Sequence, residues 1–155
     1  MEPFLPELHP NPGWGDSCKS RDIETIHSNS SENIGRACIL ELYQCDHAKL
    51  NDEAFIRTTI TSSAKMSGAT LINLVTHSFK PQGVTGLALL AESHISIHSW
   101  PEIGFAAIDV ITFGDHTMPE KACKLLFKDF LAKDFTFKNI VREIPSGIQT
   151  LHREP

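Results

Sequence analysis

The sequence predicts an α+β domain in which two helices pack on one face of an antiparallel β-sheet. Three observations lead to this prediction: several short runs rich in β-branched and aromatic residues, turn residues between those runs, and two stretches with helical periodicity. The 155 residues fit one domain, and 41% hydrophobic with 21% charged residues is typical of a globular protein.

Turn and cap residues set the expected order of elements. Asn51 or Asp52 can cap a first helix that ends near Met66, before Gly68. Pro119 suits the first turn of a second helix. The inward stripe of that second helix is expected to contain Cys123, Leu126, Phe127, Phe130 and Leu131. Strands are predicted at 37–43, 70–79, 84–91, 95–100, 105–113 and 136–144.

Composition divides the chain into three parts. Residues 1–34 are rich in proline, glycine, serine and asparagine without periodicity, which indicates a flexible extension. Residues 35–145 form the predicted domain, and residues 146–155 form a polar tail.

Charge and hydropathy exclude several classes of function. The net charge of −5 leaves no basic surface for nucleic acid or anionic lipid. No apolar run reaches the roughly 18 residues of a membrane span. The chain does not open on a basic segment followed by an apolar one, so we expect a cytoplasmic protein.

The sequence shows no pattern typical of a metal site. His94 and His98 would lie about 13 Å apart on a strand, too far to hold one ion. The cysteines form no C-x-x-C pair and are expected to be free thiols in a reducing compartment. These cysteines are Cys18, Cys38, Cys45 and Cys123.

The richest polar stretch begins at Glu92 and runs through predicted strands. Side chains alternate between the faces of a strand, so Ile95 and Ile97 should share one face. The opposite face should carry Glu92, His94, Ser96 and His98. One interpretation is a hydrolase triad of Ser93, His98 and Asp109, although the G-x-S-x-G turn is absent. Another is the solvated face of an antiparallel sheet, and the pattern alone leaves both open.

One signature in this stretch is specific to a known family. Residues 92–102 read Glu-Ser-His-Ile-Ser-Ile-His-Ser-Trp-Pro-Glu, and residues 104–109 read Gly-Phe-Ala-Ala-Ile-Asp. In these motifs the chain resembles the short, prokaryotic-type S-adenosylmethionine decarboxylases. Supporting segments extend the resemblance over about residues 35–143: 35–36, 41–46, 67–70, Phe79 and 83–86.

The resemblance implies a proenzyme that cleaves itself between Glu92 and Ser93. In this family the serine hydroxyl attacks the preceding carbonyl, and the resulting ester is lost by β-elimination. The serine then becomes a pyruvoyl group at the start of the new α chain. The resemblance assigns the role of processing base to His98, and Thr85 occupies the position of a serine that assists processing.

The same resemblance implies how the mature enzyme works. The pyruvoyl ketone forms a Schiff base with the substrate and replaces pyridoxal phosphate as the electron sink, and no metal takes part. Phe79 matches an aromatic residue that stacks on adenine, and Glu102 matches a carboxylate that receives the ribose hydroxyls. The product is the aminopropyl donor for spermidine biosynthesis. The resemblance also implies a homodimer in which two sheets form an α/β sandwich and each active site uses residues from both copies.

One position departs from the family pattern. The family has a cysteine twenty residues after the cleavage serine, which returns a proton to the substrate, and here that position is Phe113. His94, His116 or a water molecule are candidate donors. Two alternatives follow from this departure: a pyruvoyl-dependent arginine or ornithine decarboxylase, or a non-catalytic relative that keeps the fold.

Overall fold

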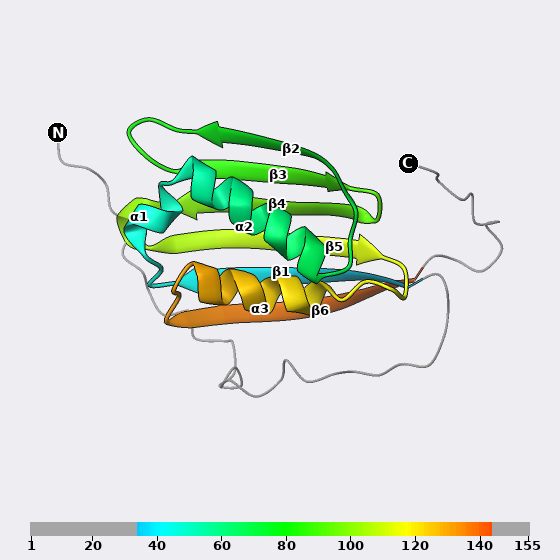
Figure 1. Cartoon of the computed structure of the whole chain (residues 1–155). Helices are drawn as coiled ribbons and strands as arrows, with labels where there is room; N and C mark the ends of the chain where they lie inside the picture. Colours follow the sequence, from blue (N-terminus) through cyan, green and yellow to red (C-terminus); the bar gives the residue numbers. More distant parts are fainter. Residues whose placement is uncertain (1–33, 144–155) are drawn as a thin grey trace.

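The computed structural model describes residues 34–143 as six antiparallel strands with helices on one face of the sheet (Figure 1). The strand order is β2-β3-β4-β5-β1-β6. The fold class predicted from the sequence is therefore confirmed. The predicted extension and tail lie outside the described residues, apart from Ile34, which begins the first strand.

The elements follow the predicted order with small shifts at their ends. The strands are β1 (Ile34–Tyr43), β2 (Leu71–Ser78), β3 (Val84–Leu90), β4 (Ser93–Trp100), β5 (Phe105–Phe113) and β6 (Asp134–Glu143). The helices are α1 (His47–Leu50), α2 (Glu53–Met66) and α3 (Pro119–Asp129), with a 3₁₀ turn η1 (Pro101–Ile103). The short α1 helix and η1 were not predicted as helical elements, and β4 begins two residues earlier than the sequence indicates.

Cap residues explain where the two long helices begin and end. Asp52 begins α2 by accepting the Phe55 backbone N–H at 3.0 Å, and Gly68 follows the helix with a φ of 77°. Pro119 opens α3 as predicted. The prediction that Leu131 faces inward was wrong, because α3 ends at Asp129 and the left-handed backbone at Leu131 turns its side chain outward.

The hydrophobic core lies between the helices and one face of the sheet. Ile95 and Ile97 of β4 are fully buried there, as strand alternation predicts. Ile56 and Ile60 of α2 and Leu126 of α3 meet them from the helical layer. The same alternation turns every second side chain of the central strands to the opposite face, which no helix within residues 34–143 covers (Figure 1).

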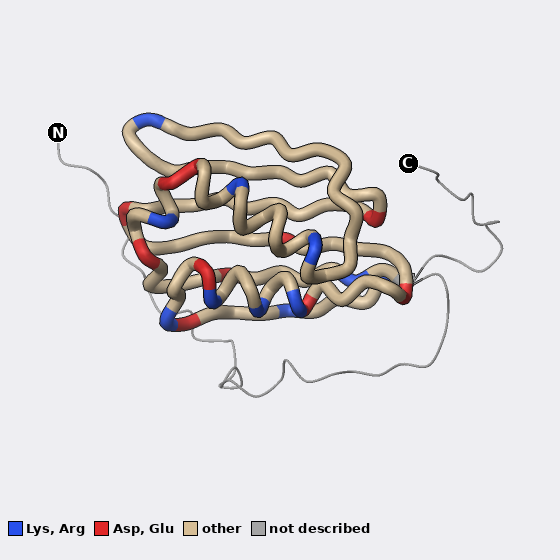
Figure 2. Tube along the Cα trace, in the orientation of Figure 1, with Lys and Arg blue, Asp and Glu red and all other residues tan. Residues whose placement is uncertain are grey.

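We call this second surface the open face. It carries exposed aliphatic side chains, with Val75, Leu87 and Leu89 between 49% and 61% exposed. Strands β2, β3 and β4 contain no Lys, Arg, Asp or Glu, and Figure 2 shows the charges gathered mainly on helices, turns and the remaining strands. An apolar sheet face of this kind is typical of a surface that packs against protein.

Two further expectations can be compared with the described residues. Within residues 34–143, no helix is long and apolar enough to cross a membrane. Cys38, Cys45 and Cys123 are buried and free, and Cys18 lies outside the described range.

Candidate active site

The bond between Glu92 and Ser93 lies at the end of a tight hairpin. Leu90 and Ser93 pair across it, so Ala91 and Glu92 form a two-residue turn. Ser93 is the first residue of β4 and has a φ of 148°. A non-glycine residue in this region of backbone conformation is strained, and such strain is characteristic of functional sites.

The Glu92 carbonyl and the Ser93 hydroxyl are both hydrogen-bonded at this hairpin. The Phe113 backbone N–H donates to the carbonyl oxygen of Glu92 at 2.9 Å. The Ser93 hydroxyl lies 3.2 Å from Nδ1 of His94. A donor on the carbonyl and a base beside the hydroxyl are what nucleophilic attack on a peptide bond requires.

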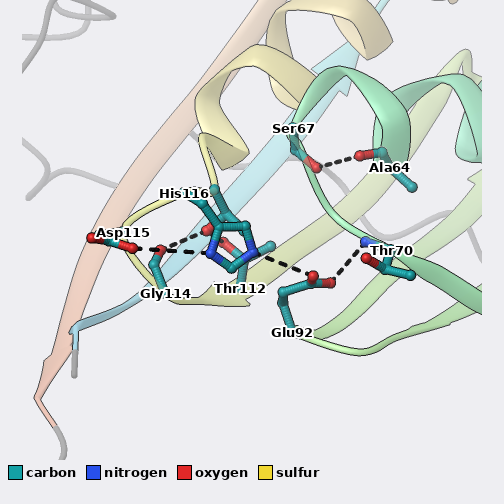
Figure 3. Close-up of polar contacts among 9 residues, drawn as sticks. Ala64, Ser67, Thr70, Glu92, Thr112, Gly114, Asp115 and His116 are labelled. Carbon is teal, nitrogen blue, oxygen red and sulfur yellow. Dashed lines mark hydrogen bonds and ion pairs between the residues drawn. The ribbon is translucent and has the colours of Figure 1, made fainter. Parts of the chain in front are cut away.

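The Glu92 side chain anchors the turn from outside the sheet. Its carboxylate accepts the Thr70 N–H at 2.8 Å and lies 3.3 Å from Nε2 of His116 (Figure 3). Burial raises the pKa of Glu92, but these hydrogen bonds outweigh burial and hold that pKa below its usual range. The prediction that Glu92 shares a strand face with His94 was wrong, because Glu92 belongs to the turn.

The remaining predicted site residues lie at the opposite end of the sheet. Thr85 pairs with His98 across β3 and β4, and Thr85 Oγ1 lies 3.0 Å from Nδ1 of His98. Phe79, which follows β2 there, is 51% exposed. Glu102 lies in η1 and accepts a hydrogen bond from Gln82 at 3.3 Å.

The chain therefore presents its predicted site residues in two groups. Ser93 and His98 are five residues apart on one strand, which corresponds to roughly 16 Å. That separation also excludes the hydrolase triad within one chain, and Asp109 instead accepts a hydrogen bond from Ser96 at 3.2 Å. No cluster of three potential metal ligands occurs among residues 34–143.

Sequence reasoning missed the groups that hold the hairpin. The Thr70 and Phe113 N–H groups belong to the backbone, so no side-chain motif indicates their role. The pairing of β4 with β5 would have indicated the contact of the Phe113 N–H. His94 and His116 were recognised only as candidate proton donors. Their contacts with Ser93 and Glu92 depend on the shape of the turn and of the 114–118 loop.

Phe113 fits the open face because residue 35 is glycine. The two residues are cross-strand partners on β5 and β1, and a Cβ atom at Gly35 would lie 2.3–2.8 Å from three atoms of the Phe113 ring. The Arg142 guanidinium lies 5.8 Å from the centre of the same ring. The ring thus packs over Gly35 and lies beside the Arg142 cation, so Phe113 contributes to the packing of this face of the sheet.

This packing leads to a test by a double-mutant cycle. Gly35→Ala is expected to lower the free energy of unfolding by about 1–3 kcal/mol, because the added methyl group must displace the ring. With Phe113→Cys also present, the same change should cost little. Urea unfolding of the four proteins, each also carrying Ser93→Ala to keep the chain whole, measures the coupling. Equal costs of Gly35→Ala in both backgrounds would contradict the proposed contact.

The fold and the hairpin geometry fit the class of small α+β proteins that carry out acyl chemistry on their own backbone. The family model of S-adenosylmethionine decarboxylase matches residues 36–143. The chain belongs to this family.

Named relatives and a solved structure agree with the family match. The S-adenosylmethionine decarboxylase proenzyme of Prochlorococcus marinus (strain MIT 9313) is 65% identical over 122 residues, covering 79% of this chain and 98% of that one. The proenzyme of Methanococcus aeolicus is 49% identical over 100 residues, covering 64% and 85%. The crystal structure of the adenosylmethionine decarboxylase from Aquifex aeolicus VF5 superposes with a TM-score of 0.69 at 32% identity, covering 77% and 98%.

Proposed function

We propose that this chain is a proenzyme that cuts itself between Glu92 and Ser93 and then decarboxylates S-adenosylmethionine. The observation that carries the proposal is the strained Ser93, placed after a carbonyl that already accepts the Phe113 N–H. Family membership and the names of relatives at up to 65% identity support this substrate over arginine or ornithine. The activity is that of a carboxy-lyase, and its product serves spermidine biosynthesis. Cytoplasmic localisation stays a prediction.

The residues at the hairpin fit the formation of a pyruvoyl group. Ser93 provides the hydroxyl that leaves with the Glu92 carboxyl group, and the hydrogen-bonded carbonyl favours its attack. Once formed, the pyruvoyl group supplies a ketone that draws electrons from the bond to the departing carbon dioxide. Thr70 and His116 hold the Glu92 side chain, so the fragment that ends at Glu92 stays beside the pyruvoyl group.

A complete site requires two copies of the chain. His98 is proposed as the base that removes the α-proton of Ser93, yet it lies roughly 16 Å along β4 from the Ser93 of its own chain. Its hydrogen bond with Thr85 orients the imidazole on the open face. We therefore propose that His98 and Thr85 serve the Ser93 of a second copy, and that the open faces of the two copies meet.

A two-fold axis provides this arrangement without any distortion of the chain. If the axis passes between Ile95 and Ser96 of β4, at right angles to the strand, then residue 98 of one copy stands over residue 93 of the other. Face-to-face sheets lie about 10 Å apart, a distance that facing side chains span. The exposed aliphatic side chains of β2 and β3 would be buried in the same contact.

The proposed substrate-binding residues would also serve the active site of the second copy. Phe79 and Glu102 lie at the His98 end of the sheet, so they would approach the Ser93 end of the second copy. Phe79 offers an exposed ring for stacking on adenine, and its edge-to-face contact with His77, at 4.8 Å between ring centres, orients it. Glu102 is exposed and can accept two ribose hydroxyls.

Release of carbon dioxide tests the choice of substrate. The purified protein is incubated with carboxyl-labelled S-adenosylmethionine, arginine or ornithine at equal concentrations, and the released label is counted. We expect release from S-adenosylmethionine alone. Glu102→Gln should raise the KM for this substrate by about tenfold, because an amide replaces a charged acceptor of the ribose hydroxyls. Release from arginine or ornithine alone would contradict the assignment.

A further inference from the structure

We infer that His94 carries the proton in the acyl shift that precedes cleavage, while His98 of a second copy acts only in the later elimination. The inference rests on the proposed self-cleavage and adds a catalytic residue to it. The proton transfers are divided between His94 of the chain that is cut and His98 of the second copy.

The observation behind this inference is a contact within one chain. Nδ1 of His94 lies 3.2 Å from the Ser93 hydroxyl, within hydrogen-bonding distance. In the tautomer with its proton on Nε2, the imidazole accepts the hydroxyl proton at Nδ1. Imidazole is the side chain best suited to exchange protons near neutral pH.

The unusual backbone of Ser93 makes this contact possible. Neighbouring residues of a regular strand point to opposite faces, so Ser93 and His94 would normally be apart. The φ of 148° at Ser93 departs from the regular strand conformation and brings the hydroxyl beside the imidazole. The strained backbone of Ser93 therefore places the hydroxyl of the same residue beside the imidazole of His94.

The acyl shift can be written with all atoms accounted for. The Ser93 hydroxyl gives its proton to Nδ1 of His94 as its oxygen bonds to the Glu92 carbonyl carbon. Negative charge on the former carbonyl oxygen is met by the Phe113 N–H, which already donates to it at 2.9 Å. The bond from that carbon to the Ser93 nitrogen then breaks, and His94 returns the proton to the leaving nitrogen. The result is an ester and a free amine, with no net gain or loss of protons.

The positions of the other histidines support this division. His98 is hydrogen-bonded to Thr85 at the far end of β4. Its proposed target is the α-proton of Ser93 in a second copy. His116 contacts the Glu92 carboxylate and is engaged in holding the turn. Among the described residues, His94 is the histidine whose ring is hydrogen-bonded to the reacting hydroxyl.

The rate of self-cleavage of newly made protein tests the inference. Cell-free synthesis of His94→Ala, followed by mass measurement over time, is expected to show cleavage at least tenfold slower than in the unaltered chain. General base catalysis typically contributes on the order of 10²–10⁴-fold, which sets this expectation. Imidazole added to the His94→Ala protein should restore part of the rate. His47→Gln, a change at an exposed histidine of α1, is the matched control and should cleave normally.

Hydroxylamine identifies the stage at which each variant stops, because it cuts esters much faster than peptide bonds. His98→Ala should accumulate the ester and be cut at residue 92, whereas His94→Ala should resist over the same interval. Melting curves like those of Ser93→Ala would show that both variants fold. Cleavage of His94→Ala within twofold of the unaltered rate, or cutting of His94→Ala by hydroxylamine to the same extent as His98→Ala, would overturn the inference. Failure of the unaltered chain to cleave would instead refute the proposed function.

Discussion

Ser93→Ala is expected to leave the chain whole and without decarboxylase activity. Alanine has no hydroxyl to attack the Glu92 carbonyl and nothing to eliminate, so neither the ester nor the pyruvoyl group can form. The expected loss is complete, because the residue is both the nucleophile and the precursor of the prosthetic group. Gel electrophoresis and carbon dioxide release measure the two effects separately.

The matched control for this change is Ser63→Ala. Ser63 is a fully buried serine of α2 whose hydroxyl has no hydrogen-bond partner among the described residues, so its removal breaks no hydrogen bond there. We expect normal cleavage and activity from this variant. Cleavage at residue 92 in Ser93→Ala would refute the assignment of the nucleophile.

The second large effect concerns two inactive variants that should restore each other. Ser93→Ala keeps His98, and His98→Ala keeps Ser93, so each alone should remain uncut. In a mixed dimer, His98 of the Ser93→Ala copy faces the intact Ser93 of the other copy. Co-expression should therefore yield cleavage from a background of essentially none, and only in the His98→Ala copy.

Tags of different mass on the two copies identify which one is cut. Purification through the tag of the Ser93→Ala copy should recover the cleaved His98→Ala fragments with it. Cleavage of His98→Ala when it is expressed alone would contradict a role for His98. If neither copy is cut in verified mixed dimers, the proposed exchange of residues across the open faces is wrong.

Strand patterns predicted most of the fold because burial controls them. Ile95 and Ile97 alternate with His94, Ser96 and His98, and the structure confirms that the two sets lie on opposite faces. Helix α2 was predicted from a cap at Asn51 or Asp52, of which Asp52 is the residue that caps it, and α3 was predicted from Pro119. These signals come from residues close together in the sequence, so they predict strands and helices without knowledge of the tertiary structure.

The features that escaped prediction depend on contacts between distant segments. No local pattern shows that Phe113 covers Gly35 or that its backbone N–H reaches the Glu92 carbonyl, because both contacts require the pairing of β5 with its neighbours. The contact of Ser93 with His94 contradicts regular strand alternation and follows from one strained dihedral angle. The separation of Ser93 and His98, by contrast, needs no contact between distant segments, because both lie on β4 and strand rise alone puts them roughly 16 Å apart.

The mass of the purified, unaltered chain decides whether the protein cuts itself between Glu92 and Ser93. We expect two fragments, residues 1–92 and 93–155, with the second lighter by one ammonia molecule than a chain that begins with serine. That second fragment should also resist Edman degradation, because a pyruvoyl group has no free amine. An intact chain of 17.2 kDa after prolonged incubation would refute self-cleavage between Glu92 and Ser93.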